Sequence, residues 1–212
     1  MNILELQRKI SSDYFDYQAL SNALAESGHI RRDIGKLIKA HHIIRVKKGL
    51  YIWGESLRQR PYSKQVLSNL IYGPSYISLE YALSFHGLTP ERVHIVTAIT
   101  PQRNKLFKTP LGTFEYRYLN LEAYPWGITW KKDKDIGNFF IASPEKALLD
   151  YLATRVKKWE VKSTIEDFLF KDLRLDEEEF KKVSLSKIKE LSSYYKSNAI
   201  KNFTKEIMKI QR

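Results

Sequence analysis

Cationic side chains are concentrated between residues 31 and 48 of this chain. An arginine guanidinium group can donate two parallel hydrogen bonds to guanine, whereas a lysine ammonium group acts on phosphate oxygens as a compact charge. Arginines and lysines in one short stretch therefore indicate recognition of double-stranded DNA. The candidate DNA contacts are seven: Arg31, Arg32, Lys36, Lys39, Arg45, Lys47 and Lys48.

The residues around these cations predict a helix that presents two different faces. Apolar side chains recur at i, i+4, i+7 and i+8, which is the period of one helical face: Ile30, Ile34, Leu37 and Ile38. Cationic side chains recur with the same period on another face: Arg32, Lys36 and Lys39. Gly35 lies beside them, either to let the helix approach a groove or as a packing position.

A two-stranded hairpin is expected after this helix. Residues 44–47 and 50–53 alternate in polarity around a turn at Lys48 and Gly49. A helix followed by a basic hairpin is the layout of a winged helix, in which the helix enters the major groove and the hairpin tip reaches the phosphates. The alternative is an ordinary solvated helix face beside a polar hairpin tip.

Two earlier helices complete a compact unit over residues 1–60. The first is predicted from the apolar residues Ile3, Leu4, Leu6 and Ile10. The second, over residues 17–25, has Asp16 as its N-cap, with Phe15 and Leu20 placed to form a hydrophobic staple. We therefore predict an N-terminal winged helix-turn-helix domain over residues 1–60, ending in a polar connector at residues 58–61.

The remaining residues, 61–212, predict a second domain of mixed character. Helices are expected over residues 61–72 and 79–86, the latter capped by Ser78. A third begins with Ser143 as cap, Pro144 in the first position and Glu145 in the first turn. Strands are expected at residues 93–99, 113–119, 128–131 and 138–142. The fold class is thus α+β, with a mixed sheet over residues 61–154 and a helical part over residues 155–212.

The segment between Pro101 and Pro110 is basic, and we expect it to be a loop between two strands. A second DNA contact, a partner contact and an exposed turn without a role all stay open for it. Tyr194, Tyr195 and Phe203 near the end of the chain are expected in the hydrophobic core rather than in a base-stacking surface.

The composition narrows the class of protein. A net charge of +12 favours a polyanionic partner, and 43% hydrophobic residues are typical of a folded chain. The chain has no cysteine, which excludes disulfides and thiolate metal sites. No signal peptide or run of roughly 20 apolar residues is present, so we expect a cytoplasmic protein without a membrane partner.

Catalytic and metal-binding patterns are missing from the sequence. The paired His41 and His42 would diverge on a helix, and no acidic residue stands at ligand spacing. Glu145 and Lys146 lack the spacing of a nuclease motif, and no glycine-rich phosphate loop or nucleophile elbow occurs. Ser78 and Ser143 are better explained as helix caps than as nucleophiles. We therefore expect no enzyme activity, no cofactor and no metal ion.

Three pieces of the sequence, in this order, resemble the AbiEi family of antitoxins from type IV toxin–antitoxin systems. They are RVKKGLYI at residues 45–52, YISLEYALSFHGL at residues 76–88 and IASPEKALLD at residues 141–150. The resemblance is clear over residues 10–155 and loose in the helical tail. His41 and His42 depart from the glycine common at this turn in relatives, and histidine tolerates the left-handed conformation better than most residues.

The resemblance implies an N-terminal winged helix that binds inverted repeats in the promoter of its own operon. It also implies a C-terminal domain for antitoxin action and a nucleotidyltransferase-like toxin encoded by the partner gene. The family's DNA contacts lie on the third helix and the wing, at positions held here by Arg31, Arg32, Lys36, Lys39, Lys47 and Lys48.

Two hypotheses of function follow. In the first, the chain is an autorepressing, sequence-specific DNA-binding antitoxin. In the second, it is an interaction module that binds a toxin or another partner directly, and its DNA affinity is incidental. A third hypothesis, a nucleic-acid-processing enzyme, requires acidic metal ligands for which the sequence offers no candidates.

Overall fold

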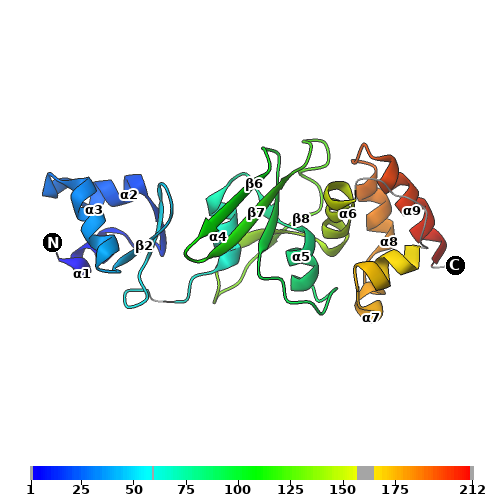
Figure 1. Ribbon diagram of the computed structural model, residues 1–212, viewed down its shortest axis with the longest axis horizontal. Helices are drawn as coiled ribbons and strands as arrows, with labels where there is room; N and C mark the ends of the chain where they lie inside the picture. The colour runs from blue at the N-terminus through cyan, green and yellow to red at the C-terminus, as the bar shows by residue number, and fades with distance from the viewer. Residues whose placement is uncertain (1, 59, 157–164, 211–212) are drawn as a thin grey trace.

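The structure is a computed structural model that describes residues 2–58, 60–156 and 165–210, without the side chain of Ile210. Helices and sheets form three groups that follow one another along the longest axis (Figure 1). The first holds residues 2–58, here called the N-terminal unit. The second is a central sheet with its helices, and the third consists of the C-terminal helices. The α+β class is therefore confirmed.

The N-terminal unit contains three α-helices and a small antiparallel sheet. The helices are α1 (Ile3–Lys9), α2 (Tyr17–Ala23) and α3 (Ile30–Lys39), with a short 3-10 turn, η1 (Ala25–Ser27), before α3. The strands are β1 (Tyr14–Asp16), β2 (Ile43–Lys47) and β3 (Leu50–Trp53), in the order β1-β3-β2. The three helices and the hairpin agree with the sequence prediction. Strand β1 was missed, because three residues are too few to show alternation.

A side-chain cap explains where α2 begins, and a glycine marks where the chain turns from η1 into α3. The Asp16 carboxylate accepts a hydrogen bond from the Ala19 amide at 2.7 Å, as the N-cap prediction required. The helix ends at Ala23, two residues earlier than predicted, and the chain continues into η1. Gly28 then adopts a φ of 67°, a left-handed conformation that costs glycine little.

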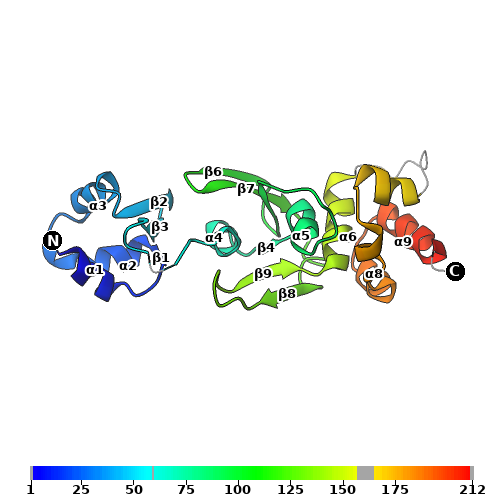
Figure 2. The same ribbon diagram turned by 90° about the horizontal axis from the view of Figure 1, so that it is seen from below.

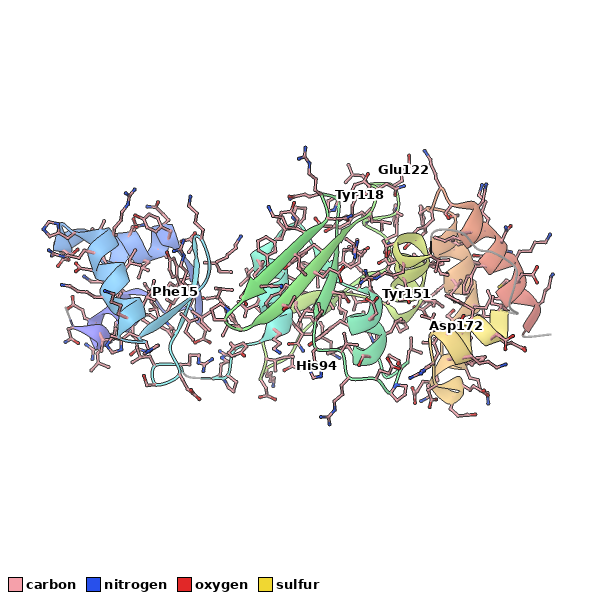
Figure 3. All side chains as sticks on the ribbon, viewed as in Figure 1. Phe15, His94, Tyr118, Glu122, Tyr151 and Asp172 are labelled. Carbon is pink, nitrogen blue, oxygen red and sulfur yellow. The ribbon has the colours of Figure 1, made fainter. Side chains whose placement is uncertain are left out.

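Apolar side chains pack on both faces of the small sheet. Its inner face packs on the three helices, and the Phe15 ring lies 4.8 Å from the Trp53 ring inside the N-terminal unit (Figure 3). Its outer face belongs to the hydrophobic cluster of the central part of the molecule through Val46, Leu50 and Ile52. The hairpin is therefore held between its own helices and the rest of the chain.

Polar contacts reinforce this attachment. The Tyr14 hydroxyl accepts a hydrogen bond from the Ser63 amide at 2.7 Å. Arg60 pairs with Asp13 at 3.2 Å and donates to the Lys134 carbonyl at 3.3 Å. The predicted connector at residues 58–61 is thus tied to both sides, although residue 59 lies outside the described residues. The boundary between residues 60 and 61 stays a prediction.

The central sheet has six strands in the order β6-β7-β5-β4-β9-β8. Two neighbouring pairs, β5 with β7 and β4 with β9, are parallel, and the others are antiparallel. The strands are β4 (Tyr76–Ile77), β5 (Val96–Thr100), β6 (Lys105–Thr109), β7 (Gly112–Tyr118), β8 (Ile128–Lys131) and β9 (Phe139–Ala142).

The prediction of a loop over residues 101–110 was wrong. Lys105 to Thr109 form β6, which pairs with β7 along its whole length as an edge strand. Lys105, Leu106 and Lys108 are exposed, so only Phe107 and Thr109 turn partly inward. A strand with so little apolar alternation gives no periodic signal in the sequence.

Helices cover both faces of the central sheet. Helix α4 (Lys64–Ile71) lies on one face, where the Tyr116 hydroxyl donates to the Ser68 carbonyl at 2.6 Å. Helices α5 (Leu79–Phe85) and α6 (Pro144–Arg155) lie on the other, where Arg155 binds Glu115 at 2.8 Å. In Figure 2, α4 lies on one side of β4, and α5 and α6 lie on the other side. The cap at Ser143 is confirmed, since its hydroxyl accepts from the Lys146 amide at 3.2 Å.

The C-terminal helices follow the helical prediction over the described residues, and α8 and α9 pack against α6. They are the π-helical turn η2 (Asp167–Asp172), α7 (Glu177–Phe180), α8 (Leu185–Ser192) and α9 (Asn198–Ile210). Tyr195 and Phe203 are buried in the core, as expected, and Tyr194 packs against it with its ring stacked on Trp126. Residues 157–164 and 211–212 of the predicted helical part fall outside the described residues.

A fully buried ion pair joins the central sheet to the C-terminal helices. The Lys146 ammonium lies 3.0 Å from the Asp150 carboxylate, and both side chains are inaccessible to solvent. Hydroxyl groups of Tyr76, Ser78 and Tyr195 donate to this carboxylate at 2.9, 2.7 and 2.6 Å. Lys146 also donates to the Ala123 carbonyl and to the Tyr195 hydroxyl, both at 2.7 Å. Every hydrogen of its ammonium group therefore has an acceptor.

This buried network corrects the expectation for Ser78. It precedes α5, but its hydroxyl makes no cap hydrogen bond because it is committed to Asp150. The network also gives two of the sequence pieces a common place, since residues 76–88 supply Tyr76 and Ser78 and residues 141–150 supply Lys146 and Asp150. Burial lowers the pKa of Lys146 and raises the pKa of Tyr76 and Tyr195. Because the Lys146 and Asp150 side chains are both inaccessible to solvent, we interpret the network as a structural link.

Candidate nucleic-acid interface

Helix α3 carries four of the seven candidate contacts on its outer surface. Arg31, Arg32, Lys36 and Lys39 are exposed, whereas Ile34 and Leu37 are buried against the other helices of the N-terminal unit. The apolar period predicted from the sequence thus fixes the rotation of the helix. Because the buried stripe faces inward, the basic residues have to face solvent.

Asp33 modifies the charge of this helix face. Its carboxylate lies 3.5 Å from the Lys36 ammonium and 3.8 Å from the Arg32 guanidinium, and the residue itself is largely buried. A hydrogen bond from Ser27 and the neighbouring Lys36 lower the pKa of Asp33. The acid therefore stays charged and holds two of the candidate contacts. Sequence reasoning missed this role, although the i, i+3 spacing from Lys36 was a visible signal.

The hairpin places its three candidate contacts in different surroundings. Arg45 and Lys48 are exposed, and Gly49 forms the turn with a φ of 84°. A register shift between Arg45 and Lys47 interrupts the pairing of β2 with β3. Lys47 is only half-exposed, and burial together with the charge of nearby Lys105 on β6 lowers its pKa. Lys47 therefore lies next to the central part of the molecule.

The turn between α3 and β2 is closed by contacts with the end of β3. His41 adopts a φ of 55°, the left-handed conformation that the sequence reasoning allowed for histidine at this turn. The Gly54 amide donates to the His42 carbonyl at 2.7 Å, and a Cβ atom on Gly54 would lie 1.9 Å from the His41 carbonyl oxygen. Only glycine fits there, so this approach fixes how the helix meets the hairpin. No pattern in the sequence singled out Gly54.

The candidate contacts therefore divide into three kinds. Arg32 and Lys36 are exposed and paired with Asp33, and Lys47 is half-buried. The other four form no ion pair with an acidic side chain of the described residues: Arg31, Lys39, Arg45 and Lys48. Helix α3 and the hairpin both belong to the N-terminal unit and contact each other (Figure 1). These four side chains can neutralise phosphates of a polyanion without first breaking internal ion pairs.

In the part of the chain that the structure describes, no three histidine, aspartate or glutamate side chains gather as a metal site would require. Among the helices with described positions, none has both the length and the apolar character needed to cross a bilayer.

No protein-family model matches the chain, and no curated protein matches it. The assignment of function therefore depends on the residues themselves.

Proposed function

We propose that this chain is a sequence-specific DNA-binding protein whose N-terminal unit acts as a winged helix. The observation that carries the proposal is the solvent-facing row of cations on α3, followed by a hairpin whose exposed Lys48 and Arg45 have no acidic partner in the described residues. Duplex DNA offers phosphates at regular spacing and guanine edges in the major groove, which match these groups in charge and in hydrogen bonding.

In this proposal, α3 lies in the major groove and the hairpin tip contacts the sugar–phosphate backbone. Arg31 and Arg32 lie at the start of α3, where a recognition helix places its base contacts. Lys39 and Lys48 hold phosphates and set the orientation of the unit without reading sequence. Association is driven largely by the release of counterions from the duplex.

The biological role we propose is that of an autorepressing antitoxin of the AbiEi kind, active in the cytoplasm and functionally linked to a nucleotidyltransferase-like toxin. The operator is expected to contain inverted repeats upstream of the protein's own operon. Support comes from the three sequence pieces. The first forms the β2–β3 hairpin, and the other two meet in the buried network around Asp150.

A gel-shift titration of the full chain on the DNA upstream of its own gene tests the proposal. If about six phosphates are neutralised, the logarithm of the affinity falls with the logarithm of the salt concentration at a slope near −5. Arg32→Ala is expected to relax the preference for one base at a cost of about 1–3 kcal/mol, and Lys48→Ala to weaken all sequences alike. A slope shallower than about −2, or unchanged binding in both variants, contradicts the proposal.

Direct partner binding is the second candidate function, and one observation favours it. The central part of the molecule exposes a group of large apolar side chains beside an open sheet edge, far from the basic face of α3 along the chain. A surface of this kind is not needed for DNA binding. Its exposed apolar side chains would suit a protein partner rather than DNA.

A further inference from the structure

We infer that the free edge of β8, together with the pocket beside it, binds an extended segment of a partner protein that carries apolar and acidic side chains. Three features define this surface, here called the β8 groove: an unpaired strand edge, half-exposed aromatic rings and exposed lysines. The inference goes beyond DNA binding and does not require it.

The strand edge supplies the backbone partners. Strand β8 is the last strand of the six-stranded sheet, and among the described residues it pairs with β9 alone (Figure 2). Alternate N–H and C=O groups of an edge strand point away from the sheet and can pair with one more extended chain. No described segment lies against this edge in the sheet order. An added strand would therefore extend the sheet without displacing anything that the structure describes.

The aromatic rings supply a pocket for apolar side chains. Trp130 of β8 and Phe140 of β9 are opposite each other in the register, with ring centroids 4.4 Å apart, and each is 45% exposed. Leu70 of α4 is exposed to the same extent and lines the same pocket of about 570 Å³, with Tyr76 and Tyr124 among its other walls. Three large apolar side chains around one cavity exceed what scattered surface residues produce.

The lysines beside β8 determine which charge we expect the partner to carry. Lys131, Lys132 and Lys134 are exposed at and after the end of β8, and no ion pair involves them within the described residues. The carboxylate of the intervening Asp133 is occupied by the amides of Asp135 and Ile136, at 2.9 and 3.0 Å. These amides leave Asp133 charged and Asp135 adds a second negative charge, so the three lysines give residues 131–135 a net charge of +1. Acidic residues of a partner complement this excess.

Protection of an edge strand against self-pairing is a common role of lysine, and it accounts for the lysines alone. It does not account for Trp130 and Phe140, because exposed aromatic side chains promote association. The same charge argues against a second copy of this chain as the occupant. Both free edges of the sheet carry exposed lysines, on β6 and on β8, in a chain of net charge +12. The occupant we infer is therefore a different protein that carries acidic side chains.

A random twelve-residue peptide display library, selected on the folded full-length chain, tests the inference. Selected peptides are expected to alternate apolar with acidic residues. One selected peptide, synthesised with a fluorescent label, then reports affinity by anisotropy. Trp130→Thr is expected to weaken binding about tenfold or more, the loss typical of an aromatic residue at the centre of an interface. Thr keeps the strand propensity of position 130 while removing the ring.

Matched variants separate this surface from general stickiness. Leu106→Thr changes a side chain that is 54% exposed on the opposite edge strand, β6, and is expected to leave the affinity unchanged. The double change Lys131→Glu and Lys132→Glu affects only exposed side chains, so it keeps the fold, and it is expected to weaken the same peptide and flatten its salt dependence. If Trp130→Thr does not fold, this double variant still decides the question.

Several outcomes overturn the inference. One is a library that yields no binder, or binders without the apolar–acidic pattern. Another is equal loss of affinity in Leu106→Thr and Trp130→Thr. A third is competition by single-stranded oligothymidine, which would make the aromatic rings a base-stacking surface instead. Operator binding by Trp130→Thr is expected to match that of the original chain, so failure of this inference leaves the DNA proposal untouched.

Discussion

At the scale of single residues, one acidic side chain, Asp33, lies within the candidate DNA surface and pairs with two of its cations. Asp33 is largely buried, holds Lys36 at 3.5 Å and Arg32 at 3.8 Å, and has its pKa lowered by Ser27 and Lys36. Its place in the first turn of α3 also favours the helix, since a negative charge complements the positive end of the helix dipole. The same charge opposes the approach of phosphates.

Asp33→Asn is therefore expected to strengthen DNA binding while weakening the fold slightly. Removing one negative charge beside Arg32 and Lys36 releases both side chains for phosphates, so affinity at low salt rises several-fold in gel shifts. The free energy of unfolding is expected to fall slightly, because the charge near the helix start is lost. Lys36→Gln is the matched control and changes affinity in the opposite direction. Equal effects of the two variants on affinity would show that α3 does not face DNA.

At the scale of elements, the junction between α3 and the hairpin is set by one close backbone approach. A Cβ atom on Gly54 would lie 1.9 Å from the His41 carbonyl oxygen, whereas a Cβ atom on Gly35 would meet nothing within 4 Å. Both glycines belong to the N-terminal unit, one at the end of β3 and one inside α3. Their different surroundings allow a direct comparison of two identical substitutions.

Gly54→Ala is expected to destabilise the protein by about 1–3 kcal/mol, because the backbone at His41 has to move. Gly35→Ala is expected to stabilise it by up to about 1 kcal/mol, since alanine favours the helix and has free space here. Chemical denaturation of both variants measures the difference. If Gly54→Ala unfolds at the denaturant concentration of the original chain, the close approach does not fix this junction.

The whole molecule is held together by contacts between its three groups. The outer face of the small sheet joins the central hydrophobic cluster, and Arg60 links Asp13 to the Lys134 carbonyl. At the other end, the Lys146–Asp150 pair lies where the central sheet, α6 and the segment after α8 meet. An ion pair without access to solvent stabilises a fold only while both partners are present.

Changes at this pair are expected to be strongly non-additive. Asp150→Asn and Lys146→Met each leave one buried charge without its partner, so each is expected to cost about 3–5 kcal/mol in the free energy of unfolding. The double variant Lys146→Met with Asp150→Asn leaves no unpaired charge, and it is expected to cost clearly less than the sum. Thermal and chemical unfolding of the three variants give the coupling. Simple additivity would mean that the pair has no role in joining these groups.

The sequence by itself determined the elements whose side chains repeat with a clear period. The helix of Ile34 and Leu37, the hairpin around Gly49, the Asp16 cap and the Ser143 cap all follow from local rules, because each depends on neighbours within about one helical turn. The exposed state of Arg31, Arg32, Lys36 and Lys39 follows from the same period.

Only the tertiary structure decided the features that join distant parts of the chain. Strand β6 pairs with β7 along its whole length, although its own residues show too little apolar alternation to predict a strand. Ser78 donates to Asp150 instead of capping α5, and Lys47 turns toward the central part of the molecule. The β8 groove is built from α4, β8 and β9, which are separated by tens of residues. Local patterns reveal which face of an element is buried, but the partner that buries it, or leaves it open, is set by contacts that no local pattern encodes.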